Sequence, residues 1–174
     1  MATRLAYLAL APQAVSTSEE SLSIRASLSR ADAWLREQPP TDTTQAAVLR
    51  LVMKRQADSP VDEVGASIDG LFSLQNSDGG WAQVNDKTSD AFATGQVLYA
   101  LNVAGVSPET DGVKKAVAFL VSTQRDDGSW LMTKRTHPGE TPTQNVIPIT
   151  YFGSAWATLG LLRCVPGECV RVPP

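Results

Sequence analysis

The sequence predicts an all-α protein built from repeated helix pairs. A phrase that runs from Gln to Trp occurs twice, as QNSDGGW at residues 75–81 and as QRDDGSW at residues 124–130. Apolar residues recur at helical spacing on both sides of each phrase, and the alternation typical of β-strands is nearly absent. A repeat made of helices predicts stacked units, because a single helix pair cannot bury its apolar face alone.

Length and composition fit one compact domain over residues 1–174, with an irregular tail at 164–174. The chain has 174 residues, of which 43% are hydrophobic, enough to build a core. Its 15 basic and 18 acidic residues give a net charge of −3 without charge runs, which argues against a nucleic-acid partner. No apolar stretch approaches the ~20 residues that span a bilayer. We therefore expect a soluble protein without a transmembrane segment, and of the two open compartments we favour the cytoplasm over export.

The expected helices are of two alternating types. The polar-faced type should face water, and the nearly uncharged type, such as 90–104 and 151–163, should be enclosed. About three pairs of one polar-faced and one apolar helix follow, at 20–56, 61–104 and 109–163. The full set of expected helices is 2–11, 20–37, 43–56, 61–75, 90–104, 109–123 and 151–163.

The first of these segments has two interpretations. Arg4 precedes an apolar run, as in a signal peptide. The run is short and meets Pro12, whereas residues 2–10 align with residues 93–101. We therefore favour the second helix of an earlier repeat, which gives a leading half-repeat.

Each Gln-to-Trp phrase should form a turn that seals two helices. Gly79 and Gly128 both follow an Asp, and glycine accepts the positive φ common at a helix end. Trp81 and Trp130 each supply a broad apolar ring with one N–H donor. In the first pair, residues 38–40 (QPP) stand in place of the phrase.

The phrase resembles the QW motif of squalene and oxidosqualene cyclases, whose domains are α/α toroids. The resemblance implies an outer ring of helices around an inner ring, a ring that protein prenyltransferase β subunits share without being cyclases. It covers residues 60–163 by motif and 1–56 by helix pattern only. The structural residues that it implies are Gln75, Gly80, Trp81, Gln124, Gly128 and Trp130.

The chain supplies too few helix pairs to close such a ring, so it resembles roughly half a toroid. An open arc would expose the apolar sides of its inner helices, a larger patch than monomers usually tolerate. We therefore expect either a homodimer that completes the ring or a missing half in a longer protein.

The resemblance leaves one candidate catalytic residue, Asp90. Cyclases of the hopene type protonate an alkene with the middle acid of an Asp-x-Asp-Asp-Thr-Ala motif, because so weak a base needs an activated carboxylic acid. When the motif is registered on residues 99–102 (YALN), Asp90 and Thr94 match, but Phe92 and Ala93 occupy the two central acid positions. Asp90, or Ser89 beside it, is alternatively a plain helix N-cap.

No metal or cofactor is expected. The prenyltransferase zinc site resembles Asp-x-Cys with a distant His, and here Phe92 occupies the cysteine position. His137, the only histidine, lies in a loop without a suitable partner. Cys164 and Cys169 flank a Pro-Gly turn and could form a disulfide, or Cys164 could be a small buried apolar residue.

The groups expected near the concave centre suit an apolar, isoprenoid-like ligand, or alternatively pack the core. The long connection 131–149 could place Lys134 and Arg135 over one mouth of the ring to meet an anion such as a diphosphate, or be a proline-stiffened surface loop. The central groups are Asp90, Phe92, Tyr99, Tyr151, Phe152 and Trp156.

Three functions of different classes remain. We favour a toroid that lacks the proton donor and the zinc ligands and binds an apolar ligand or a partner protein; Asp90→Asn would leave that binding largely intact. The second is an active terpenoid-processing enzyme completed by another chain or a missing half. The third is a purely structural repeat module.

Overall fold

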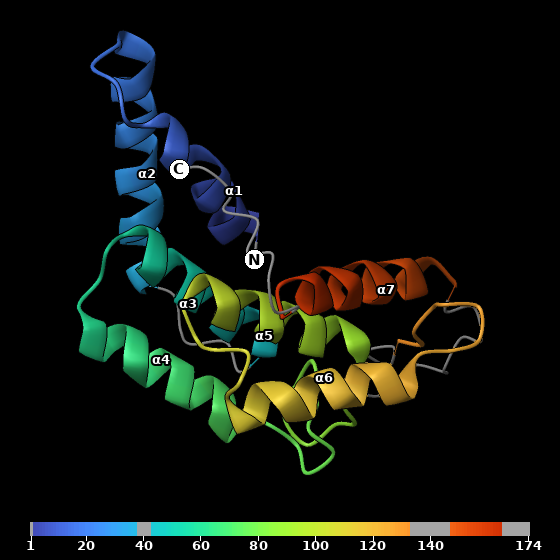
Figure 1. Ribbon diagram of the computed structural model, residues 1–174. Coiled ribbons are helices and arrows are strands. Elements are labelled where there is room, and N and C mark those ends of the chain that lie inside the picture. The colour runs from blue at the N-terminus through green and yellow to red at the C-terminus, as the bar shows by residue number, and fades with distance from the viewer. Residues whose placement is uncertain (1, 38–42, 133–146, 165–174) are drawn as a thin grey trace.

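The computed structural model describes residues 2–37, 43–132 and 147–164 (Figure 1). Within these ranges the chain is helical, and the only β contact is an isolated bridge between Thr43 and Val84. None of the described helices is long and apolar enough to cross a lipid bilayer. The elements are α1 (Ala2–Leu10), the 3₁₀ helix η1 (Ala11–Gln13), α2 (Glu19–Glu37), α3 (Thr44–Gln56), α4 (Val61–Ser73), α5 (Ala91–Val103), α6 (Asp111–Thr123) and α7 (Ile147–Leu162).

The all-α class is confirmed, and each helix expected from the apolar spacing is present. The largest difference is at α7, which begins at Ile147, whereas its start was expected at 151. Pro148 falls in its first turn, where proline is tolerated because the N–H groups there have no partner within the helix. All but the first residue of the expected irregular tail lies outside the described residues.

The helices form two layers, as in a fragment of an α/α toroid. Four inner helices form a row in which α1 packs on α3, α3 on α5, and α5 on α7. The outer helices α2, α4 and α6 pack mainly on the inner helix that precedes each of them in the chain. Figure 1 shows α4 and α6 following one another along one side of the inner row, while α2 extends away from it.

Two kinds of connection separate the helices. The short turn at 57–60 lets α3 and α4 pack directly against each other. The longer connection at 74–90 carries Trp81, which is fully buried between α4 and α5. The members of the second predicted pair therefore meet largely through a tryptophan, and an outer helix makes its direct helix contacts mainly with the preceding inner helix.

Helix α5 forms the centre of the core. It contains no charged residue, and Val97, Leu98 and Leu101 are at most 1% exposed. The outer helices α4 and α6 bury one face only, chiefly through Leu71 and Leu120. The expected contrast between enclosed and water-facing helices is therefore confirmed for α4, α5 and α6.

Helix α7 is enclosed on one side only, so the expectation for residues 151–163 is wrong for its other side. Tyr151, Phe152 and Leu162 are 73%, 61% and 60% exposed. The side that packs on α5 is buried at Ala157 and Gly160. The difference arises because no helix of the described ranges follows α7 in the inner row. An open arc is expected to leave the outward side of its last inner helix exposed in this way.

Two glycines let α5 and α7 pack closely. A Cβ placed on Gly95 would lie 2.2 Å from the carbonyl oxygen of Trp156. A Cβ on Gly160 would lie 2.8 Å from the carbonyl oxygen of Gly95. Backbone atoms cannot withdraw as a flexible side chain can, so these positions fix the separation of the two inner helices.

Candidate functional site

Trp81 joins an outer helix to an inner helix. Its ring is fully buried, and its Nε1 donates a 2.7 Å hydrogen bond to the carbonyl oxygen of Leu71 in α4. Its backbone N–H donates to the Thr94 hydroxyl in α5 at 2.9 Å. One residue therefore supplies apolar contact and hydrogen bonds to both helices of the junction.

Trp130 repeats this geometry in the next junction. It is 3% exposed, and its Nε1 donates to the carbonyl oxygen of Leu120 in α6 at 2.7 Å. Its backbone N–H donates to the Ser154 hydroxyl in α7 at 3.1 Å. The two junctions thus place Thr94 and Ser154 at equivalent positions of the repeat.

The two glutamines differ in how many acceptors they reach. Gln75 Nε2 donates to the carbonyl oxygens of Gly79 and Gly112, both at 2.8 Å, and so ties its own turn to the start of α6. Gln124 Nε2 donates to the carbonyl oxygen of Gly128 at 3.0 Å. No outer helix follows α6 in the described ranges, and Gln124 has no equivalent of Gly112 there.

The glycines of the phrase serve backbone geometry and space. Gly79 and Gly128 have φ values of 87° and 80°, in the region that favours glycine. Gly80 has no room for a side chain, because a Cβ would lie 2.7 Å from the Ser89 Cβ and 2.9 Å from the Phe119 ring. Backbone conformation and packing therefore explain the glycines of the phrase without any ligand.

Asp90 is the N-cap of α5. It is 3% exposed, and its Oδ1 accepts a 2.8 Å hydrogen bond from the backbone N–H of Ala93. Its Oδ2 accepts a 2.6 Å hydrogen bond from Gln83 Nε2. The neighbouring Ser89 donates instead to Asp78 Oδ1. Both carboxylate oxygens of Asp90 are thus held by protein donors, as the capping interpretation predicts.

Tyr99 and Trp156 come together from α5 and α7. Their ring centres are 5.7 Å apart at 79°, an edge-to-face arrangement. The Arg163 guanidinium carbon lies 5.3 Å from the centre of the Tyr99 ring, and the Arg163 carbonyl accepts from Asn102 Nδ2 at 2.9 Å. The sequence analysis predicted the two aromatic residues but missed Arg163, a cation that directly follows the uncharged helix α7.

The other predicted ligand residues are not all gathered there. Phe92 is half-buried on α5, whereas Tyr151 and Phe152 are exposed on α7. Lys134 and Arg135, predicted to bind an anion, lie outside the described residues, as does His137. Among the described residues, the candidate ligand-binding surface on α5 and α7 is thus aromatic and apolar, with Arg163 at one end.

Gln96 is a further polar group on the same part of α5. It is 3% exposed, and within the described ranges its Oε1 is buried and accepts no hydrogen bond. Helical spacing puts it on one stripe with Phe92 and Val103. A polar residue inside a nearly apolar helix is the signal that could have marked it from the sequence.

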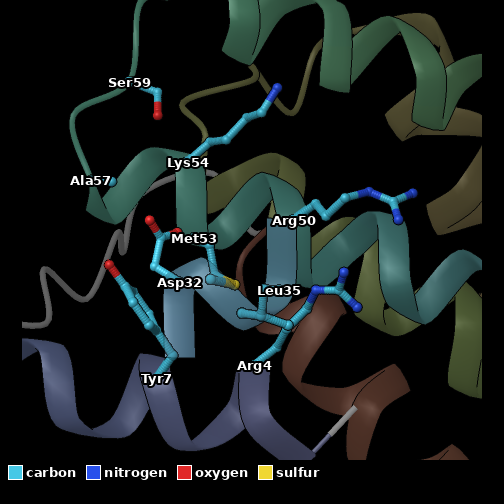
Figure 2. A pocket seen from close by; sticks show the side chains of 9 residues that line it. All are labelled: Arg4, Tyr7, Asp32, Leu35, Arg50, Met53, Lys54, Ala57 and Ser59. Atoms are coloured by element: carbon cyan, nitrogen blue, oxygen red, sulfur yellow. The ribbon is translucent and has the colours of Figure 1, made fainter. Parts of the chain in front are cut away.

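A cavity of about 300 Å³ is formed by α1, α2, α3 and the turn after α3 (Figure 2). The side chains of Arg4 and Arg50 extend toward one side of the view, whereas the Tyr7 hydroxyl lies on the other. Asp32 lines it with the cations, so its wall is of mixed charge. The sequence did not indicate this cavity. It is lined by Arg4, Tyr7, Asp32, Leu35, Arg50, Met53, Lys54, Ala57 and Ser59.

A second, more polar cavity of about 290 Å³ lies beside the first Gln-to-Trp phrase. Of the predicted ligand residues that the structure describes, none lines either cavity. The part of the chain that is described contains no cluster of three His, Cys, Asp or Glu side chains suited to a metal ion. The lining of the second cavity is Thr44, Ser73, Leu74, Gln75, Asn76, Ala82, Val84, Asn85 and Asp86.

Cys164 packs against the core at the end of α7, as its apolar interpretation predicts. Burial raises the pKa of its thiol. Cys169 lies outside the described residues, so the alternative of a disulfide stays a prediction.

These features define the class of protein: a segment of an α/α toroid whose helices are braced by buried tryptophans. The profile of the squalene-hopene cyclase C-terminal domain family matches residues 18–172. The chain belongs to this family.

Curated relatives agree with the family match. The chain is 31% identical over 125 residues to a probable squalene–hopene cyclase of Sinorhizobium fredii, and 27% identical over 124 residues to a squalene–hopene cyclase of Zymomonas mobilis. A squalene–hopene cyclase of Bradyrhizobium diazoefficiens is 29% identical over 125 residues. Each match covers 71% of this chain and 19% of the relative, so the chain spans only about a fifth of their length.

Proposed function

We propose that this chain is a cyclase-type toroid segment that binds an apolar, isoprenoid-like ligand through the aromatic side chains of α5 and α7. The Tyr99–Trp156 pair carries the proposal, because it joins two inner helices at a half-buried position where an apolar ligand gains contact area. The names of the relatives support this ligand class, since each is described as a squalene–hopene cyclase.

The proposal excludes acid catalysis by this segment alone. Protonation of an alkene needs a carboxylic acid that has its proton available to the substrate. Asp90 is instead committed to Ala93 and Gln83 as a helix cap. The resemblance to the cyclase motif places Phe92 and Ala93, which have no acid, at the central acid positions.

A second candidate function is an active terpenoid-processing enzyme whose acid comes from outside this segment. The observation that favours it is the length of the relatives, because four fifths of each lies beyond the match. In that case the aromatic face would form one wall of a reaction cavity that other helices complete.

The partner would be whatever continues the arc beyond α7. The exposed Tyr151, Phe152 and Leu162 support this part of the proposal, because monomeric proteins rarely leave such residues together in water. We propose a second copy of the chain as that partner. If the protein binds no ligand, the third function, a purely structural repeat module, is the one that remains.

Ligand binding is tested by titrating the protein with farnesol and with detergent-dispersed squalene, with tryptophan fluorescence and native mass spectrometry as readouts. We expect Trp156→Leu to weaken binding at least roughly tenfold, from the contact area lost. Val121→Ala, on the exposed face of α6, is the control and should bind as the wild type does. Equal affinity of wild type and Trp156→Leu would contradict the proposed site.

Chemistry is tested separately by incubating the protein with squalene and analysing extracts by mass spectrometry. We expect no cyclised product from the wild type, and unchanged farnesol affinity in Asp90→Asn, because Asn is also an effective N-cap. A cyclised product that Asp90→Asn leaves unchanged would establish the second candidate function, whereas a product that Asp90→Asn abolishes would make Asp90 the acid and contradict its assignment as a helix cap.

A further inference from the structure

The outward side of α7 corresponds to the side of α5 that packs on α7. The hydroxyls of Thr94 and Ser154 accept from the backbone N–H groups of Trp81 and Trp130, which fixes the register between the two helices. In this register each residue of α5 corresponds to one residue of α7. The surfaces of the two helices can therefore be compared position by position.

The side of α5 that faces the next inner helix is defined by contacts. Gly95 meets the backbone of Trp156, and the Leu98 Cβ lies 3.1 Å from a Cβ placed on Gly160. Tyr99 packs on the Trp156 ring, and Asn102 bonds to the carbonyl of Arg163. All of these contacts lie along one face of α5.

The corresponding residues of α7 are all exposed. Gly95, Leu98, Tyr99 and Asn102 correspond to Ala155, Thr158, Leu159 and Leu162, of which Leu159 and Leu162 are 44% and 60% exposed. None of the four is charged. We call these four residues the trailing face. In the repeat it is the surface on which a following inner helix would lie.

The repeat also indicates what a following helix must present. On α7, the side that receives α5 carries Trp156, whose ring packs on Tyr99, and two small residues, Ala157 and Gly160. The two small residues correspond to Val97 and Ala100 of α5.

Helix α1 presents such a side. The alignment of residues 2–10 with 93–101 places Ala6 and Ala9 at the positions of Val97 and Ala100. Both alanines are exposed. Leu8, on another side of α1, packs against the core, so the alanines lie on a side that the core leaves exposed. We call Ala6 and Ala9 the leading face.

We propose that the trailing face of one copy binds the leading face of a second copy, so that α1 of the second copy takes the place of the next inner helix. This inference rests on the partner part of the proposed function and specifies its geometry. The contact is head-to-tail because two different surfaces meet, the trailing face with Leu159 and Leu162 and the leading face with its two alanines. Two copies that each use both faces form a closed ring. If the ring does not close, further copies add end to end.

Native mass spectrometry and sedimentation velocity without added ligand test the contact. We expect the wild type to self-associate at micromolar concentrations. Leu162→Glu and Ala6→Glu should each weaken self-association at least roughly tenfold, because each puts an unpaired charge into an apolar contact. Val121→Glu, whose wild-type side chain is 63% exposed on α6, is the control and should associate as the wild type does. Helical circular dichroism and a cooperative thermal transition show that each variant is folded.

The decisive measurement is an equimolar mixture of Leu162→Glu and Ala6→Glu. Each variant retains the face that the other has lost, so the mixture should form a one-to-one heterodimer that does not grow further. A monomeric wild type would overturn the proposal. So would undiminished association of Ala6→Glu, which would mean that two trailing faces meet each other. Neither variant alters Tyr99 or Trp156. The self-association result can therefore be interpreted even if the protein binds no apolar ligand.

Discussion

At the residue scale, hydrogen bonds show which side chains act as structural braces. Trp81 and Trp130 make the same pair of bonds in successive junctions, so their spacing in the sequence translates directly into a spacing of helices. Asp90 was the single catalytic candidate, and its bonds are those of a cap.

Trp81→Phe should lower the free energy of unfolding by about 1–3 kcal/mol. The ring remains apolar, but its N–H no longer reaches the Leu71 carbonyl and a smaller ring leaves space in the core. Urea unfolding followed by far-ultraviolet circular dichroism measures the change. An unaltered midpoint would show that this hydrogen bond contributes nothing.

Gln96→Leu should leave the stability unchanged or raise it by about 1 kcal/mol. The substitution removes a buried oxygen that accepts no hydrogen bond in the described ranges and keeps an apolar side chain of similar size. The same urea titration tests it. A marked loss of stability would reveal a hydrogen bond of Gln96 to a group outside those ranges.

Cys164 should become reactive only at higher pH than an ordinary thiol. Burial raises its pKa, because the thiolate is disfavoured away from water. The stability gained by keeping the thiol neutral is complete below the unfolded-state pKa and is lost as pH rises through the folded-state pKa. Iodoacetamide labelling of Cys169→Ser against pH measures it, with the unfolded variant as reference. Equal labelling profiles of the two states would contradict this prediction.

At the element scale, the close contact of α5 and α7 depends on glycine, whereas the two glycines of α4 have free space. A Cβ placed on Gly95 would lie 2.2 Å from the carbonyl oxygen of Trp156 in α7, but a Cβ on Gly65 in α4 would meet nothing within 4 Å. The two positions form a matched pair, since both lie within α-helices.

Alanine at these two glycines should therefore have opposite effects. Gly95→Ala should destabilise by roughly 1–3 kcal/mol, because the helices must separate. Gly65→Ala should stabilise by about 0.5–1 kcal/mol through helix propensity. Thermal unfolding of both variants tests the pair. If Gly95→Ala were neutral, the helix contact would be looser than the structure shows.

At the scale of the whole molecule, the described helices pack most closely around α5, at the centre of the arc, and the arc is open at its two ends. Helix α5 packs on α3, α6 and α7, whereas α2 packs on α1 and η1. Because α5 has neighbours on both sides of the inner row, opening it requires several junctions to separate.

Amide hydrogen exchange should accordingly be slowest in α5 and fastest in α1 and α2. Mass spectrometry of peptic fragments resolves the helices. Association through the trailing face should add protection to α7 and α1 as protein concentration rises. Uniform protection across all helices would contradict this gradient.

The sequence by itself determined the all-α class, the order of the helices and the two tryptophan junctions, because helical periodicity and a repeated phrase are local signals. It also placed Tyr99 and Trp156 among the groups expected near the concave centre. Only the tertiary structure decided that Asp90 is a bonded cap, that Arg163 lies over Tyr99 and that the buried Gln96 oxygen accepts no bond within the described ranges. It also decided which side of α7 stays uncovered. Those outcomes depend on contacts between residues far apart in the chain, and apolar spacing alone carries no information about which neighbour a helix meets.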